Sequence, residues 1–169
     1  MSLVILTGAS GSGKTTIARA FANRHPSLAG VCYFDSIGVP TVDEMIRQYG
    51  SGEEWQRLMT AEWLCKISNR LRDGPILFEG QMRLAFIHEA AKAANISRYA
   101  TILVDCDDQT RKRRLMLERR QAELASDEMM NWARYLRDEA MTRGDRILDT
   151  STISVGKAVE VVRKIFDAR

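Results

Sequence analysis

The 169-residue sequence has few of the features that define the specialised classes of protein. Three prolines and eleven glycines leave no room for a collagen-like or proline-rich segment. No apolar run is long enough to cross a membrane, and the apolar start Leu3–Leu6 is short and has no basic flank. We therefore expect neither a signal peptide nor a membrane segment, and no membrane partner.

The sequence also has few cysteines and a small net charge. Cys32, Cys65 and Cys106 are widely spaced and form no zinc-binding pattern. Cys32 lies inside an apolar run and Cys106 just beyond one, which predicts buried free thiols and a reducing, cytoplasmic compartment. The net charge of +3 is too small to indicate nucleic-acid binding by itself. With 45% hydrophobic and 28% charged residues, the composition is that of a globular protein, and the length favours a single domain over residues 1–169.

Five short apolar runs alternate with stretches of helix length. The runs are nearly continuous, which is typical of a parallel sheet buried on both faces. They lie at residues 3–6, 31–34, 75–78, 100–104 and 146–148, and the helical stretches lie at residues 13–25, 53–72, 82–94, 108–124, 127–143 and 155–166. The order predicts an α/β fold with a five-stranded parallel sheet and helices on both faces. In the long second stretch, Trp55, Met59 and Trp63 are four residues apart, and we interpret this stripe as core packing rather than ligand lining.

The strongest motif is a glycine-rich loop between the first strand and the first helix. It matches G-x-x-x-x-G-K-[ST] and consists of Gly8, Ala9, Ser10, Gly11, Ser12, Gly13, Lys14, Thr15 and Thr16. Glycines let backbone N–H groups approach phosphate oxygens, and the helix N-terminus adds partial positive charge. Lys14 can reach the β- and γ-phosphates, and the Thr15 hydroxyl is the expected Mg²⁺ ligand. The loop predicts a bound nucleoside triphosphate with Mg²⁺.

Two classes of nucleotide-binding protein fit the remaining sequence poorly. A GTPase would carry an N-K-x-D guanine motif, which is absent. A motor or AAA-type ATPase would have a larger domain and a hydrophobic strand ending in Asp-Glu. Here the strand at 76–78 ends in one acid, Glu79, followed by Gly80. We therefore expect neither class.

The loop and three further segments resemble the P-loop kinases, the group with nucleoside monophosphate kinases, shikimate- and gluconate-type kinases and antibiotic phosphotransferases. The resemblance implies a three-layer sandwich with a short lid. The first segment, Phe34-Asp35-Ser36, ends the second predicted strand and is similar to the acceptor site of chloramphenicol phosphotransferase-type enzymes. By this resemblance Asp35 would orient an acceptor hydroxyl or accept its proton.

The second segment, Glu79–Arg83, follows the third predicted strand. It is similar to the Asp-Gly-x-Pro-Arg segment of adenylate-kinase-like enzymes, although Glu79 replaces Asp and Met82 replaces Pro. By this resemblance Glu79 would lie near magnesium, and Arg83 would pair with an anionic group of the acceptor. Asp35 thus favours a hydroxyl acceptor and Arg83 a phosphorylated one, and the sequence leaves both open.

The third segment is a cluster of six cations between Asp108 and Arg120. In P-loop kinases, arginines after the fourth strand and in the lid stabilise charge on the transferring phosphoryl group. The candidates favoured here are Arg119 and Arg120, at the start of a lid expected at about residues 119–128. Arg134 and Arg137 on the following helix are further candidates.

The resemblance implies an ATP-dependent phosphotransferase for a small-molecule or nucleotide acceptor, with acceptor-binding helices at about residues 36–74. Two alternatives remain. A polynucleotide-end kinase would use the same loop with a basic groove, which the low net charge disfavours. A non-catalytic ATP-binding switch would bind ATP without acceptor-stimulated turnover. Nothing in the sequence indicates an oligomeric state.

The loop generates a first prediction. Lys14→Ala should abolish phosphoryl transfer, because no other residue of the motif supplies a charge to the β- and γ-phosphates. The fold should remain intact, as checked by circular dichroism beside the activity assay. Turnover retained in a folded Lys14→Ala protein would contradict the assignment of the motif.

Overall fold

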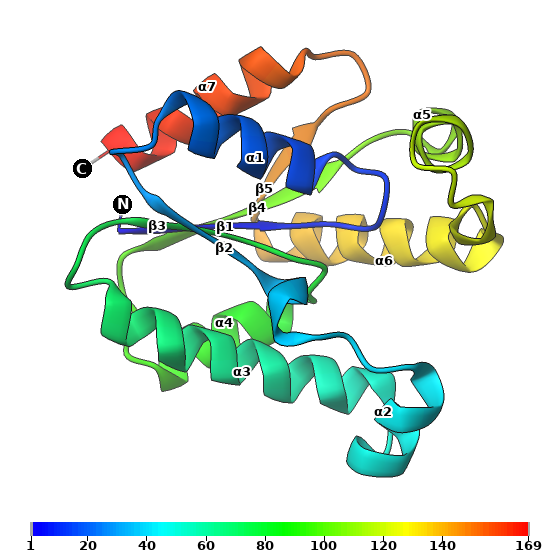
Figure 1. Cartoon of the computed structure of the whole chain (residues 1–169), viewed down its shortest axis with the longest axis horizontal. Helices are drawn as coiled ribbons and strands as arrows, with labels where there is room; N and C mark the ends of the chain where they lie inside the picture. Colours follow the sequence, from blue (N-terminus) through cyan, green and yellow to red (C-terminus); the bar gives the residue numbers. More distant parts are fainter. Residues whose placement is uncertain (1, 169) are drawn as a thin grey trace.

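In the computed structural model, which describes residues 2–168, a five-stranded parallel sheet divides the molecule into layers (Figure 1). The strands follow the order β2-β3-β1-β4-β5, and every neighbouring pair is parallel. Their bounds are β1 Leu3–Thr7, β2 Gly30–Tyr33, β3 Ile76–Glu79, β4 Tyr99–Asp105 and β5 Arg146–Asp149. The predicted α/β architecture is confirmed, and each predicted strand lies within a residue or two of its observed position.

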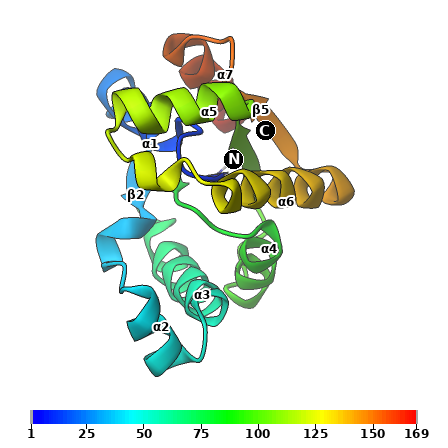
Figure 2. The ribbon, with the colours of Figure 1, turned by 90° about the vertical axis from the view of Figure 1, so that its right-hand side faces the viewer.

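Helices cover both faces of the sheet. On one face lie α1 (Lys14–Arg24) and α7 (Val155–Asp167). On the other lie α3 (Gly52–Arg70), α4 (Leu84–Ala93) and α6 (Asp127–Arg143), with the short α2 (Val42–Tyr49) beyond α3 (Figures 1 and 2). A 3-10 turn, η1 (Phe34–Ile37), joins β2 to the α2 region. The edge with the carboxyl ends of the strands is where ligands of open α/β sheets bind.

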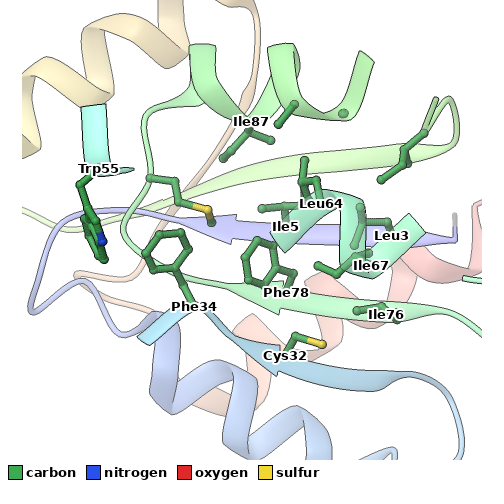
Figure 3. Close-up of a cluster of buried hydrophobic side chains, with 14 of the residues drawn as sticks. Leu3, Ile5, Cys32, Phe34, Trp55, Leu64, Ile67, Ile76, Phe78 and Ile87 are labelled. Atoms are coloured by element: carbon green, nitrogen blue, oxygen red, sulfur yellow. The ribbon is translucent and has the colours of Figure 1, made fainter. Parts of the chain in front are cut away.

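The two core layers follow from alternation along the central strand. Leu3 and Ile5 of β1 point toward α3 and α4, as Figure 3 shows, whereas Val4 and Leu6 point toward α1 and α7. A strand covered on both faces must be apolar at every position, which explains the continuous runs. Trp55 is buried in the first layer, where it meets Phe34 edge-on. The other two residues of its stripe, Met59 and Trp63, pack against the same layer, which confirms the core interpretation.

The helix predicted over 108–124 is wrong in its second half. α5 (Asp108–Arg113) continues into a single π-helical turn, η2 (Arg114–Glu118), and then stops. Arg120 has a left-handed φ of 53°, which no helix accommodates. A 3-10 turn, η3 (Ala122–Leu124), completes the connection to α6. Charge and helical periodicity did not reveal this break, because the sequence has no glycine or proline there.

Two composition-based expectations can be compared with the structure. Cys32 and Cys106 are buried free thiols as predicted, whereas Cys65 is exposed. Among residues 2–168, no helix combines the length and apolar character needed to span a bilayer.

Candidate active site at the phosphate-binding loop

The phosphate-binding loop lies at the carboxyl end of the central strand β1 and leads into α1. Three of its glycines have positive φ, namely 151° at Gly8, 79° at Gly11 and 98° at Gly13. A Cβ on Gly8 would lie 2.1 Å from the carbonyl oxygen of Val104, so only glycine fits against β4. Gly13 caps α1 without a side-chain hydrogen bond, which leaves the first-turn N–H groups for an anionic ligand.

Lys14 lies almost entirely inside the loop, with 8% of its surface exposed. Its Nζ is 3.4 Å from the carbonyl oxygen of Ala9. Burial lowers the pKa of Lys14 to about 8, although the nearby carboxylates of Glu79 and Asp35 partly oppose this effect. The amine is therefore poised in the loop without a full counterion, as a phosphate-binding lysine must be.

Thr15 and Glu79 form the part of the site that could hold a metal. The Thr15 hydroxyl donates to both carboxylate oxygens of Glu79, at 3.2 and 3.3 Å. Burial raises the pKa of Glu79, against the influence of Lys14 and of the Thr15 hydrogen bond. Mg²⁺ prefers such oxygen ligands and usually takes one or two from protein, with waters and substrate phosphates completing the shell. The Thr15 and Glu79 oxygens therefore fit a nucleotide-borne Mg²⁺, which needs few ligands from the protein.

Asp35 is held at this edge by close packing beneath it. It lies in η1, immediately after β2, and is exposed. A Cβ on Gly80 would lie 2.3 Å from the Cβ of Phe34, so glycine is needed where β3 leaves the sheet. Trp63 Nε1 donates to the Phe34 carbonyl at 3.1 Å, which fixes the same turn from α3.

Arg111 supports the loop from behind. Its side chain is fully buried, and Nη1 donates to the Ser10 carbonyl at 2.8 Å. Nη2 donates to the Asp105 carboxylate at the end of β4, at 2.6 Å. The second oxygen of Asp105 accepts from Nε of Arg137 on α6, also at 2.6 Å. A buried pair of opposite charges thus ties the loop to β4 and α6.

Arg114 holds the next part of the loop in the same way. Its Nη1 lies 3.3 Å from the carbonyls of Gly11 and Ser12 and 2.9 Å from the Thr150 hydroxyl. Its Nη2 donates to the Thr150 carbonyl at 2.8 Å. The Thr150 hydroxyl in turn donates to the Ser12 carbonyl at 2.8 Å. The segment after β5 is therefore joined to the phosphate-binding loop through this arginine.

A cavity of about 460 Å³ lies over the loop and the start of α1. Its walls bring together the loop, the end of α5 with η2, and the segment between β5 and α7. The lining residues are Gly11, Gly13, Lys14, Thr15, Thr16, Ile17, Arg19, Arg113, Arg114, Glu118, Arg119, Thr150, Ile153, Ser154, Val155 and Ala158. Its volume falls within the range of small-ligand pockets.

The predicted lid arginines have different positions. Arg119 lines the cavity, and its charge acts on Lys14. Arg120 is exposed and lies outside the lining. Arg134 is within 3.6 Å of Asp108 and hydrogen bonds Asn131. Of these arginines, Arg119 therefore has the position expected of a phosphate-facing residue.

The remaining predicted residues lie around the loop. Ala9 is buried against the α6 side, and Ser12 is buried within the loop. The Ser10 hydroxyl is 3.3 Å from Oε1 of Gln81. Arg83 forms an ion pair with Glu53 at 2.7 Å, so the structure gives it a partner inside the protein.

The sequence analysis did not identify the residues that support the loop by hydrogen bonds. Arg111 and Arg114 were counted within the cation cluster, and neither Asp105 nor Thr150 was singled out. One signal was available, because Asp105 ends an apolar strand and a carboxylate in such a place needs a cation. Which of the six cations would be its partner depends on how α5 docks, and the sequence does not show that.

Comparison with known proteins places the chain in a family. The family model described as an AAA domain matches residues 4–131. The chain belongs to this family. The description of the family differs from our sequence-based expectation, which disfavoured an AAA-type ATPase because Glu79 is followed by Gly80 and the domain is small. None of the curated proteins compared with the chain matches it.

Several solved structures with a similar fold are kinases. A sugar kinase from Janibacter sp. HTCC2649 is 15% identical with a TM-score of 0.74, over 99% of this chain and 95% of that one. Shikimate kinase from Acinetobacter baumannii, in complex with shikimate, is 17% identical with a TM-score of 0.62, over 99% and 92%. Shikimate kinase from Aquifex aeolicus is 17% identical with a TM-score of 0.61, over 98% and 96%. The expected resemblance to P-loop kinases is confirmed at the level of the fold.

The contacts of Arg111 with Ser10 and Asp105 predict effects on stability and on ATP binding. Arg111→Met keeps the apolar stem and removes one of the two cations of Asp105, which retains Arg137, so the free energy of unfolding should fall by about 1.5–3 kcal/mol. ATP affinity should fall as well, because the Ser10 carbonyl loses its donor. Denaturant unfolding and ATP titration measure the two effects.

Two further variants make this prediction specific. Arg111→Lys keeps a charge near Asp105 but offers one nitrogen in place of the two that reach Asp105 and Ser10, so it should retain more stability and still bind ATP weakly. The exposed Arg113→Met should change stability by no more than about 0.5 kcal/mol. Wild-type ATP affinity in folded Arg111→Met and Arg111→Lys proteins would contradict the proposed support of the loop.

The lowered pKa of Lys14 predicts a pH dependence. Phosphate binding favours the protonated amine, so ATP affinity should be constant below about pH 8 and weaken by up to about tenfold per pH unit above it. An unfolded lysine keeps its proton up to its ordinary pKa of 10.5, so Lys14 should make the fold more stable as pH rises from about 8 toward 10.5. Titration of ATP from pH 6.5 to 9.5 tests the first effect. If Lys14→Met shows the same midpoint, another group is responsible.

Proposed function

We propose that the protein is an ATP-dependent phosphotransferase that moves the γ-phosphoryl group of ATP to a small-molecule or nucleotide acceptor. One observation carries the proposal. Buried Lys14 feels the charges of Asp35 from η1, Glu79 from β3 and Arg119 from beyond η2. Groups that come from separate elements and act on one amine are suited to phosphoryl transfer, which needs positioning and charge stabilisation more than covalent chemistry.

The loop would bind the phosphates of ATP. The N–H groups at the start of α1 and the Lys14 ammonium would neutralise the β- and γ-phosphates. Thr15 and Glu79 would hold Mg²⁺, which when bound neutralises charge on the phosphate oxygens. The nucleoside would occupy the rest of the cavity, between η2 and the segment before α7.

The transfer would take place on the Asp35 side of Lys14. Asp35 would orient an acceptor hydroxyl or accept its proton. Arg119 would stabilise charge on the moving phosphoryl group, and the proposed lid at residues 119–128, with Arg120 in it, would exclude water on closing. α2 and α3 lie where the acceptor-binding region is proposed, which is consistent with a small acceptor.

The structure offers support against the nucleic-acid alternative. Arg111 is fully buried, and Arg114 donates into the loop and Thr150, so two of the six clustered cations are directed inward. A basic groove for a polynucleotide needs such cations at the surface. We also propose a cytoplasmic location, since free thiols such as exposed Cys65 suit a reducing compartment.

The proposal predicts that acceptors stimulate ADP release and that Arg119 is needed for it. Arg119→Ala should lower kcat about 10³-fold or more while the fold is retained, by analogy with arginines that stabilise the transferring phosphoryl group. Lys112→Ala is the matched control, because Lys112 is an exposed cation of α5 that does not line the cavity. Release of ADP during incubation with ATP and an acceptor panel is the measurement. Tight ATP binding with no stimulation by any acceptor would instead support a non-catalytic switch.

A further inference from the structure

We infer that the acceptor is an uncharged or cationic hydroxy compound, and neither a carboxylate nor a phosphate ester. The inference rests on the proposed phosphotransferase function and settles the conflict between Asp35 and Arg83 in favour of Asp35. Its basis is the distribution of charge on the acceptor side of the site. We define this side as η1, the end of β3 with residues 80–83, and the first turns of α3.

The groups nearest the reaction on this side are acidic. Tyr33 of β2 and Glu79 of β3 are paired in register, so the carboxyl ends of the two strands are adjacent and Asp35 follows close to Glu79. The electrostatic influence of Asp35 on both Glu79 and Lys14 reflects this proximity. An anionic acceptor would approach the exposed Asp35 carboxylate, and like charges at short range are unfavourable.

The cation that could attract an anion, Arg83, is already engaged. Its Nη1 pairs with Glu53 at 2.7 Å. Its guanidinium also lies over three aromatic rings, 4.9 Å from the centroid of Tyr135, 5.5 Å from Phe86 and 5.6 Å from Trp132. Only 25% of the side chain is exposed. Such stacking favours a guanidinium held in place over one free to move.

The backbone of this segment is fixed as well. The Gln56 side chain accepts from the Arg83 N–H and donates to the Gln81 carbonyl, both at 3.0 Å. The N–H groups of Leu84 and Ala85 at the start of α4 donate to the Glu139 carboxylate at 2.9 Å. Arg83 is therefore held between α3, α4 and α6, and the N-terminus of α4, another place where an anion could bind, is occupied by a carboxylate.

Two of the three cations of α3 are paired with carboxylates, and the third, Arg70, lies in the last turn, where it donates to Cys32 Sγ at 3.2 Å. Arg57 pairs with Glu54, and Lys66 pairs with Glu62, each one turn away on the same helix. Each of these pairs is weak, but together they leave α3 without excess positive charge toward the acceptor. The acceptor side thus offers carboxylate oxygens, whereas Arg83 and Arg57 are already paired. This chemistry suits a polyol or a hydroxy-amine, which brings hydrogen-bond donors of its own.

Transfer to a neutral hydroxyl needs no reactant beyond ATP and the acceptor. The acceptor oxygen forms a bond to the γ-phosphorus of ATP, and the bond from that phosphorus to the β–γ bridging oxygen breaks. ADP leaves with the electron pair, and the hydroxyl proton passes to the Asp35 carboxylate. An added ammonium group on the acceptor would find the exposed Asp35 carboxylate as a partner.

The test compares acceptors that share a skeleton and differ in charge. Glucose, glucosamine, gluconate and glucose 6-phosphate form one series, adenosine and AMP a second, and shikimate and its methyl ester a third. ADP release with the intact chain, ATP and Mg²⁺ gives kcat/KM for each compound. We expect the best acceptor to be neutral or an amine and to exceed its acidic counterpart at least tenfold. A best acceptor that carries a carboxylate or phosphate overturns the inference and leaves the proposed function intact. If no compound stimulates ADP release although ATP binds, the proposed function fails and this inference with it.

A pair of variants tests the assignment of Arg83 independently. Arg83→Gln should lower thermal stability and leave the KM of the best acceptor within about threefold. If Arg83 binds an anion of the acceptor, KM should instead rise roughly 10- to 100-fold, as expected for loss of a charge-assisted hydrogen bond. Glu53→Gln removes the partner of Arg83 and should also leave this KM unchanged. A large rise in KM for Arg83→Gln, or a marked fall for Glu53→Gln, would overturn the inference.

Discussion

The buried pair of Arg111 and Asp105 is the interaction on which the rest of the site depends. A peptide unit is planar and trans, so its C=O and N–H point in opposite directions. By holding the Ser10 carbonyl from behind, Arg111 directs the N–H of Gly11 away from itself. Arg114 acts in the same way on the Ser12 carbonyl and the N–H of Gly13. The dipoles of the loop are thus oriented before a ligand arrives, and preorganised dipoles are what stabilise developing charge most effectively.

The same arrangement disfavours the charged form of Lys14, and this strengthens its interaction with a phosphate. Packing arginines and the sheet around the loop buries Lys14, and burial lowers its pKa to about 8. An amine in this state gains more from a phosphate than a solvated lysine would, because the phosphate supplies the charge partner that solvent no longer provides. Asp35 and Glu79 keep the amine protonated in the meantime, so the carboxylates serve the ligand-free loop as well as the proposed chemistry.

Two connections link this centre to the periphery. Asp105 also binds Arg137, so α6, which follows the proposed lid, is attached to the support of the loop. On the acceptor side, Arg83 joins α3 to α6 through Glu53 and the rings of Trp132 and Tyr135. In both places an arginine that the sequence presents as a possible phosphate ligand is used to hold protein segments together. The consequence is a site whose positive charge is concentrated around the phosphate-binding loop, whereas Arg83, on the side proposed for the acceptor, is already paired.

The sequence by itself determined the sheet, most of the helices and the position of the phosphate-binding loop. These features depend on residues that are neighbours in the sequence, namely continuous apolar strands and a glycine pattern with a strict backbone requirement. Such local signals can be recognised without knowledge of the tertiary structure. The end of the helix at η2 and the separation of Arg119 from Arg120 were decided only by tertiary structure. So were the assignment of Arg111 to Asp105 and the engagement of Arg83 by Glu53. An arginine has the same propensity and charge whether it faces solvent, a carbonyl or a ligand, and only the packing of distant elements determines which of these it meets.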